Sequence, residues 1–313
     1  MTIFINFIKM KKIKINNKIN ELIILSIILI LFVYYAKLKN KNEENYITLV
    51  TALYQLPTNR HNFSDYFIWI ENFLKVNKPI VFYIQKNLSQ IIKKKRPKIF
   101  SNKTIFIEKN FSKLYFSKYK KEFEETYKID KLKFKHNVQL FILWNEKIKF
   151  LELAIKKNYF KSKYFLWIDA GYFRNKDVTN YINNWPAVNK CKQDPRVIIN
   201  EVRKITKEEF DKLMSFDEKA HRKFQNEPNT LANAFGGRID YLLKFINLYY
   251  KIFQLFIKKK LFIGSEQNFY SILGHQHPEI IKFIQSTSYD ALKNYYLDNN
   301  YILNLLMNHI LWL

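Results

Sequence analysis

The stretch YFLWIDAGYFR, residues Tyr164–Arg174, places a run of five apolar residues directly before an acid. An apolar run of this length, followed by a turn signal, is typical of a strand buried in a parallel sheet. Asp169 then falls at the carboxyl end of the strand, and Gly171 gives the backbone freedom to turn after it. Ligands of open α/β sheets bind beyond the carboxyl ends of the strands. Asp169 is therefore either a ligand-binding carboxylate or an acceptor for the amides of its own loop.

Strands and helices alternate on the amino-terminal side of this stretch. Tyr46–Tyr54 is rich in β-branched and aromatic residues and predicts a strand, as do Pro79–Ile84 and Thr104–Ile107. Between the first two strands, Ser64 and Asp65 predict the capped start of a helix. A strand, a helix and a second strand form a βαβ unit. We therefore expect an α/β fold with a mostly parallel, Rossmann-like sheet flanked by helices.

The alternation continues toward the carboxyl terminus. Apolar runs and helical periodicity predict strands at 138–144, 164–168 and 197–199 and helices at 146–157, from 207 and at 239–256. Thr206–Glu209 has the spacing of a capping box and opens the second of these helices. Ser265 is expected to cap one more helix, and the basic run Lys93–Arg96 is interpreted as a solvated loop.

The composition excludes some classes of protein and leaves others open. The chain has 313 residues, of which 48% are hydrophobic, so it can bury a sizeable core. Its one cysteine, Cys191, rules out an intrachain disulfide and a cysteine-based zinc cluster. The formal net charge of +26 suits RNA or an anionic membrane surface, but compositional drift toward exposed lysine explains it equally well.

The amino terminus predicts a membrane anchor. Residues 22–36 are apolar and uncharged, and lysines flank them on both sides. The run is shorter than a usual span, and a buried helix of a soluble domain is the alternative. We predict a basic tail at 1–21, a signal-anchor helix at 22–36, a linker at 37–45 and one α/β domain at 46–313. The tail is then cytosolic, and the domain lies across the membrane.

Polar residues at other strand ends are candidate partners of Asp169. Lys147 lies in the first turn of a predicted helix, where the helix dipole disfavours a cation, which indicates an anionic ligand. Asn145 is a candidate substrate ligand or simply the cap of that helix. Arg60 follows the first strand, a common ligand contact in such sheets. Arg174 offers a planar fork to a phosphate, or pairs with Asp169.

Two later motifs complete the candidate site. Gly236 and Gly237 are two of only five glycines, and they predict a close backbone approach or a positive φ. Glu266 and Gln267 begin the helix after Ser265; Glu266 either complements the helix dipole or acts as a base at the edge of a pocket.

Several well-known motifs are missing from the sequence. It contains no G-x-G-x-x-G, no P-loop lysine motif, no H-E-x-x-H and no G-x-S-x-G. Dinucleotide, P-loop and zinc-protease hypotheses are thereby excluded. His275 and His277 are interpreted as loop residues.

The order of five short motifs resembles the poorly characterised HtrL/YibB family over residues 46–285. The motifs are LVTALY, followed by Arg60, then LWNEK, FLWIDAG, FGGR and GSEQNF. The layout is more distantly similar to GT-A glycosyltransferases. That resemblance implies that Asp169 takes the place of an Asp-x-Asp motif, which binds a cation such as Mn²⁺ or Mg²⁺ and a nucleotide-sugar diphosphate.

The same resemblance places Gly236 and Gly237 in the glycine segment, and Glu266 and Gln267 at the acidic helix start on the acceptor side. Asp169-Ala170-Gly171 lacks the second acid of the motif. Metal dependence is therefore open, and Lys147 or Arg174 is the alternative group to neutralise the diphosphate.

Together these features predict a membrane-anchored glycosyltransferase-like protein that transfers a sugar from a nucleotide-sugar donor to an unknown acceptor. Asp169 and Glu266 are the predicted catalytic residues, and no nucleic-acid partner is expected. One alternative is a non-catalytic sugar- or nucleotide-binding protein that kept the fold. Another is a basic protein that binds nucleic acid or an anionic membrane.

Overall fold

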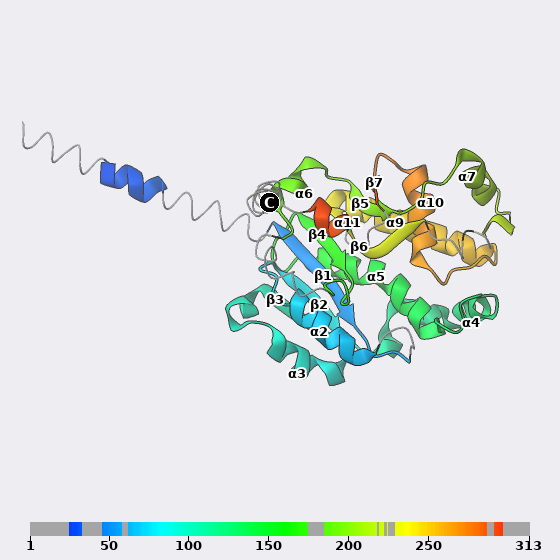
Figure 1. Cartoon of the computed structure of the whole chain (residues 1–313), viewed down its shortest axis with the longest axis horizontal. Coiled ribbons are helices and arrows are strands. Elements are labelled where there is room, and N and C mark those ends of the chain that lie inside the picture. The colour runs from blue at the N-terminus through cyan, green and yellow to red at the C-terminus, as the bar shows by residue number, and fades with distance from the viewer. Residues whose placement is uncertain are drawn as a thin grey trace, which may run out of the picture. The chain divides into compact units, whose positions relative to one another are not determined.

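The computed structural model describes residues 25–32, 46–57, 62–174, 185–217, 219–221, 224, 229–286 and 291–296. Its contacts divide the chain into two units, Met1–Glu44 and Asn45–Leu313. We call the second unit the body; it contains the sheet and every strand described (Figure 1).

Within the first unit, residues 25–32 form a helix whose side chains are exposed. None of the described helices has the length and apolar content that a membrane span requires. The predicted basic tail, both ends of the predicted anchor 22–36 and the linker lie outside the described residues, so the anchor stays a prediction.

The body is built on one seven-stranded sheet with the order β3-β2-β1-β4-β6-β5-β7 (Figure 1). All neighbouring strands are parallel except β6, which runs antiparallel to both β4 and β5. The strands are β1 Ile47–Leu53, β2 Ile80–Ile84, β3 Thr104–Glu108, β4 Tyr164–Ile168, β5 Val197–Glu201, β6 Thr230–Arg238 and β7 Ile281–Gln285. The expected α/β fold with a mostly parallel sheet is confirmed.

Helices cover both faces of the sheet, and this explains why its central strands are apolar throughout. Successive side chains of a strand point to opposite faces, so Leu49 belongs to one core cluster and Val50 to the other. The first face packs against α2, α3 and α6, and the second against α5, α9 and α10. The helices are α2 Phe63–Phe73, α3 Lys86–Lys95, α4 Lys120–Lys128, α5 Val138–Lys157, α6 Val188–Gln193, α7 Lys207–Met214, α9 Ile239–Lys258, α10 Glu266–Gln276 and α11 Ala291–Tyr295, with short 3₁₀ helices at Lys98–Lys103, Phe111–Lys113 and Tyr115–Tyr119.

The predicted strand at 138–144 is wrong, because these residues form the first two turns of α5. The helix begins after Asn137, whose side-chain oxygen accepts a hydrogen bond from the amide of Leu140. Asn145 is therefore no cap but an interior residue of the helix. α5 packs against β1, β4, α4 and α9, so most of its surface is apolar. A helix buried on several sides has the same continuous apolar run as a buried strand.

Two smaller predictions also change. Asn62 holds the N-cap position of α2, so Ser64 and Asp65 lie inside its first turn. The basic run expected to be a loop is instead the last turn of α3, followed by Arg96. Lysines in the last turn of a helix complement its dipole, which gives the run a structural reason.

Arg96 is buried, although it ends a basic run. Its guanidinium donates to the carbonyl oxygens of Leu74, Val76 and Lys78, in the connection between α2 and β2. Burial lowers the pKa of Arg96 to about 10, and the group stays charged at neutral pH. The side chain thus satisfies the carbonyl group of Leu74 at the end of α2 and two further carbonyl groups of the buried connection.

The glycine pair lies in the middle of the sheet. Gly236 is paired with Leu166 and Gly237 with Phe165 in the β4–β6 ladder. A Cβ at Gly236 would overlap the Phe165 carbonyl oxygen, and one at Gly237 would lie 2.8 Å from the Arg196 carbonyl oxygen. The predicted close approach is confirmed, and neither glycine has a positive φ.

Candidate functional site

Three charged side chains from distant parts of the sequence meet beyond the carboxyl end of β4. The ammonium of Lys147 lies 3.0 Å from Asp169 Oδ1 and 2.8 Å from Glu266 Oε1. Lys147 comes from α5, Asp169 follows β4 directly, and Glu266 is the first residue of α10. We call these three residues the triad; they are the predicted residues that the fold brings into direct contact.

The backbone and one indole fix the position of Asp169. Its amide donates to the carbonyl oxygen of Asn233 on β6, which continues the strand pairing by one residue. The indole Nε1 of Trp167 donates to Asp169 Oδ1 at 2.7 Å. Since Lys147 contacts the same carboxylate, the side chain is held from two directions. The sequence left two roles open for Asp169, a ligand-binding carboxylate or an acceptor for the amides of its own loop. The contacts with Lys147 and Trp167 do not match the second role.

Solvent reaches one member of the triad far more than the others. The side chain of Asp169 is 33% exposed, whereas those of Lys147 and Glu266 are 5% and 4% exposed. Any ligand in solution therefore meets Asp169 first. Glu266 and Lys147 act on such a ligand through Asp169 and through the field of their charges.

Burial and pairing oppose each other in the electrostatics of the triad. Burial alone would lower the pKa of Lys147, but attraction to Asp169 and Glu266 outweighs it and raises that pKa above its usual value. Burial raises the pKa of Glu266, and the neighbouring ammonium partly reverses that rise. Lys147 is thus firmly cationic, and it makes a buried carboxylate tolerable in α10.

The hydrogen-bond capacity of Lys147 is fully used. An ammonium group has three donors. The carbonyl oxygen of Ala232 on β6 accepts one at 2.9 Å, and the two carboxylates accept the others. Lys147 therefore has no donor left for a phosphate, and the prediction that it neutralises a diphosphate does not match this geometry.

The triad does not form a good site for a divalent cation. Both oxygens of Asp169 lie within 3.2 Å of the Lys147 ammonium, which would repel a second cation. Trp167 occupies Asp169 Oδ1 with its donor. Among the described residues, no group of three or more His, Cys, Asp or Glu side chains is arranged to hold a metal ion. The surroundings of Asp169 thus suit a carboxylate paired with an ammonium group better than a carboxylate that binds Mn²⁺ or Mg²⁺.

Asn145 and the glycine pair have structural roles near the site. Asn145 is fully buried, and its amide donates to the carbonyl oxygens of Phe141 and Ile263. Its oxygen accepts a hydrogen bond from the hydroxyl of Tyr249. These bonds fasten α5 to α9 and to the turn before α10, which positions Lys147 and Glu266. Gly236, opposite Leu166 in the ladder, permits close strand packing rather than contact with the triad.

The remaining candidate ligands are Arg174, Gln267 and Arg60. Arg174 is exposed, donates to the Gly171 carbonyl oxygen and stacks over the ring of Trp69 at 4.7 Å. Gln267 is half-buried, and its carbonyl oxygen accepts a hydrogen bond from Thr230. Arg60 lies outside the described residues.

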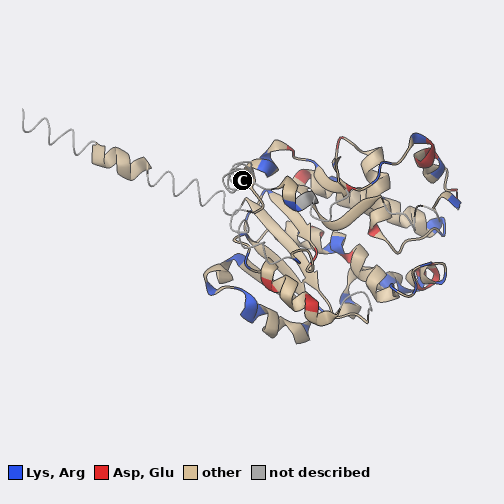
Figure 2. Ribbon diagram, in the orientation of Figure 1, with Lys and Arg blue, Asp and Glu red and all other residues tan. Residues whose placement is uncertain are grey.

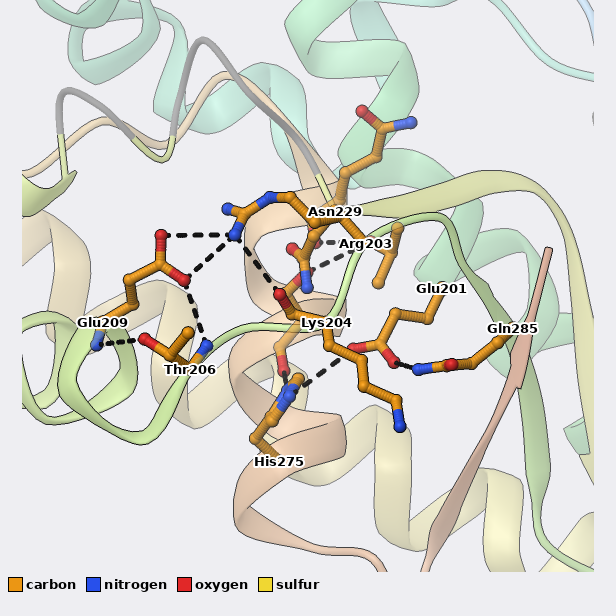
Figure 3. A network of polar contacts seen from close by, with 11 residues as sticks. Glu201, Arg203, Lys204, Thr206, Glu209, Asn229, His275 and Gln285 are labelled. Carbon is orange, nitrogen blue, oxygen red and sulfur yellow. Dashed lines mark hydrogen bonds and ion pairs between the residues drawn. The ribbon is translucent and has the colours of Figure 1, made fainter. Parts of the chain in front are cut away.

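A second polar network, shown in Figure 3, lies on the same edge of the sheet. Glu201 ends β5 and accepts a hydrogen bond from Gln285, which ends β7. His275 Nε2 lies 3.4 Å from Glu201 Oε1, and the guanidinium of Arg203 pairs with Glu209 of α7. β5 and β7 point the same way as β4, so these residues flank the site on the carboxyl edge.

The sequence interpretation missed this network for an identifiable reason. The strand predicted from the sequence ends at Ile199, two residues before Glu201, and the sequence predicts a loop at His275. The structure instead places His275 in the last turn of α10. The run VIINE resembles FLWID in that an acid follows an apolar run, here with Asn200 between them, and would have predicted a second carboxylate at a strand end.

Comparison with known proteins adds no family. No protein-family model matches the sequence, and no curated protein matches it. The resemblance to the HtrL/YibB family therefore stays a prediction.

Proposed function

We propose that the protein is a glycosyltransferase-like enzyme, carried on an amino-terminal membrane anchor, that transfers a sugar from a nucleotide-sugar donor to an acceptor hydroxyl. One observation carries the proposal: a partly exposed carboxylate, Asp169, lies at the carboxyl end of a central strand and is held there by a buried cation. The mostly parallel α/β sheet with helices on both faces is the architecture that the resemblance to GT-A glycosyltransferases implies.

Asp169 is the member of the triad that can act on the acceptor. The sequence offers two acids, Asp169 and Glu266, as the base. Glu266 is buried and bound to Lys147, so Asp169 is the better candidate. The acceptor hydroxyl gives its proton to Asp169, and its oxygen forms a bond with the anomeric carbon. The bond from that carbon to the diphosphate oxygen breaks as the new bond forms, and its electron pair leaves with the nucleoside diphosphate.

The departing diphosphate needs a cation that the triad does not offer. Arg174 is exposed, belongs to the turn after Asp169 and carries a guanidinium that suits a phosphate. We assign the charge stabilisation to Arg174, with Arg60 as the second predicted ligand. Lys147 then acts as a positioning residue, because it orients Asp169 and contacts no substrate.

Turnover of nucleotide sugars by the full-length protein tests the proposal. UDP- and GDP-sugars are incubated with the wild type and with Asp169→Asn, which keeps the shape of the side chain and removes its basicity. We expect the variant to lose about 100-fold or more in turnover, the usual contribution of a general base. Equal turnover by the two proteins would remove Asp169 from the mechanism.

Asp194→Asn is the matched control. Asp194 is also a largely buried carboxylate in an ion pair, but it precedes β5 at the opposite edge of the sheet. This variant should lose stability while keeping turnover per folded molecule. If both variants lose activity equally, the loss reflects folding and not the site.

One observation favours a second candidate, a sugar- or nucleotide-binding protein without catalysis. Lys147 and Trp167 already contact the carboxylate of Asp169, so its oxygens have hydrogen-bond partners before any substrate arrives. Calorimetric titration with UDP- and GDP-sugars separates the two candidates. Binding without turnover supports the non-catalytic protein, whereas turnover that requires Asp169 supports the enzyme.

A further inference from the structure

The edge of the sheet opposite the triad is strongly basic. Strands β1, β2, β3, β4 and β5 run in the same direction, and all of them begin at this edge. The antiparallel strand β6 runs the other way and ends there. We define the amino edge as the four connections that lead into β2, β3, β4 and β5, which are residues 75–79, 97–103, 158–163 and 189–196. In Figure 2, lysine and arginine segments recur on this side of the body, on α6, on α3 and on the turn after α3.

The charge of the amino edge exceeds what the composition of the chain explains. Its four connections hold nine lysines and arginines and a single acid, whereas the whole chain has 53 basic and 27 acidic residues. That acid, Asp194, is neutralised by Arg196 and Lys282. The basic residues are Lys75, Lys78, Lys98, Lys103, Lys161, Lys163, Lys190, Lys192 and Arg196.

Several of these lysines face solvent. Lys98, Lys161 and Lys163 are exposed, and Lys75 and Lys190 are half-buried. Among the described residues, none of these five lysines has an acid within ion-pair distance. Lysines that form no ion pair raise the local potential and attract an anionic partner.

Two large apolar side chains stand out among these charges. Ile99, next to Lys98, is 76% exposed, and Tyr159, two residues before Lys161, is 46% exposed. Both belong to the amino edge, so the surface is amphipathic as well as basic. Tyrosine and aliphatic side chains between lysines are typical of surfaces that enter the interface of a lipid bilayer.

We propose that the amino edge docks on an anionic lipid bilayer, with Ile99 and Tyr159 inserted at the level of the headgroups and the lysines against the lipid phosphates. The chemistry favours lipid over nucleic acid, because Ile99, the more exposed of the two apolar side chains, offers a base nothing to stack on, and Arg196, the one arginine of the edge, is engaged by Asp194. The chain also enters the body at this edge, since Tyr46 directly precedes β1.

Docking in this way has a consequence for the candidate site. Asp169 lies beyond the carboxyl end of β4, so a bilayer at the amino edge leaves the triad at the opposite edge of the sheet, where solvent still reaches Asp169. The proposal does not depend on the activity proposed for the triad. A failure to bind lipid would leave that activity untouched, and a lack of turnover would leave the docking surface untouched.

Site-specific fluorescence on the full-length chain tests the docking. Cys191 is the single native cysteine and is buried, so a new cysteine on the surface can be labelled selectively with a polarity-sensitive dye. Ile99→Cys and Tyr159→Cys carry the dye on the amino edge. Gln55→Cys, exposed beyond the carboxyl end of β1, is the control position. Each labelled protein is mixed with vesicles of phosphatidylcholine alone or with added phosphatidylserine.

We expect a blue shift and a rise in emission at positions 99 and 159 with the anionic vesicles, and none at position 55. Reversing Lys98 and Lys163 to Glu should weaken the docking equilibrium at least fivefold for each lysine lost. The same reversal at Lys121 and Lys131, exposed lysines outside the amino edge, should change it little.

Four results would overturn the proposal: no shift at positions 99 and 159, an equal shift with neutral vesicles, an equal shift at position 55, or an equal loss in the two charge-reversed proteins. A dye response to single-stranded RNA that is larger than the response to anionic vesicles would identify nucleic acid as the partner instead. Because all the changed residues are at least partly exposed, circular dichroism should show the native fold in each variant.

Discussion

Lys147→Met tests the idea that this cation makes the buried carboxylate of Glu266 tolerable. Methionine keeps the length of the side chain and removes its charge. Glu266 must then stay charged without a partner or take up a proton. Protonating a carboxyl group of ordinary pKa 4.5 at pH 7 costs about 3.4 kcal/mol, at 1.36 kcal/mol for each pH unit. This agrees with the roughly 3–5 kcal/mol lost when a buried pair is broken.

The same reasoning gives a pH dependence with a definite sign. In the variant, burial raises the pKa of Glu266 above that of the unfolded chain, with no ammonium to oppose it. A carboxyl group with a raised folded-state pKa destabilises the protein above the unfolded value, and the penalty disappears as the pH falls toward that value. The free energy of unfolding, measured by urea titration, should therefore fall by about 3 kcal/mol at pH 7 and by less than about 1 kcal/mol at pH 5.

The double variant Lys147→Met, Glu266→Gln is the matched control. Glutamine carries no charge, so the pH-dependent part of the penalty should vanish and stability at pH 7 should partly recover. A penalty for Lys147→Met that is the same at pH 5 and pH 7 would refute the reasoning. So would a double variant no more stable than the single one at pH 7.

Three further variants test separate parts of the fold by urea titration. Gly236→Ala should cost about 3 kcal/mol, because the new methyl group overlaps the Phe165 carbonyl oxygen; a loss below about 1 kcal/mol would contradict the tight ladder. Hydrogen bonds from Arg196 lower the pKa of Asp194 from 3.8 to about 2, so the wild type should lose about 2 kcal/mol more than Asp194→Asn does as the pH falls from 4 to 2. Asn137→Ala should cost about 1 kcal/mol through the lost cap of α5, and an unchanged free energy of unfolding would show that water replaces the cap.

The sheet was more predictable from the sequence than the helix that supports the site. β1, β2 and β4 are buried on both faces, so each is a short and mostly apolar run. α5 is also apolar over most of its surface, and its first seven residues look the same as a strand. A helix differs from a strand by the 3.6-residue period of its apolar residues, which can be seen only over more than two turns. In α5 the polar residues Asn145 and Glu146 interrupt the apolar pattern at that point.

The sequence signals for the residues of the candidate site differ in how well they match the structure. Asp169 was predicted from its place after an apolar strand, and that strand is confirmed. Lys147 was chosen because it lay in the first turn of a helix, yet it lies in the third turn of α5. It reaches Asp169 because α5 crosses β4, a tertiary contact that has no local signal in the sequence. Arg174 could be identified only as a nearby cation, since its stacking on Trp69 also depends on the fold.

The asymmetry of the triad argues against a purely structural origin. A buried ion pair between Lys147 and Glu266 would satisfy both charges, and it is no more stabilising than apolar residues of similar size. Asp169 adds a second carboxylate to a lysine that is already neutralised, and this leaves the group with one net negative charge. Such an excess is unfavourable in a closed core, but it is tolerated here because solvent reaches Asp169. A fold that needed only stability would have no reason to keep this acid at the tip of β4, whereas a site that must receive a proton from a ligand would.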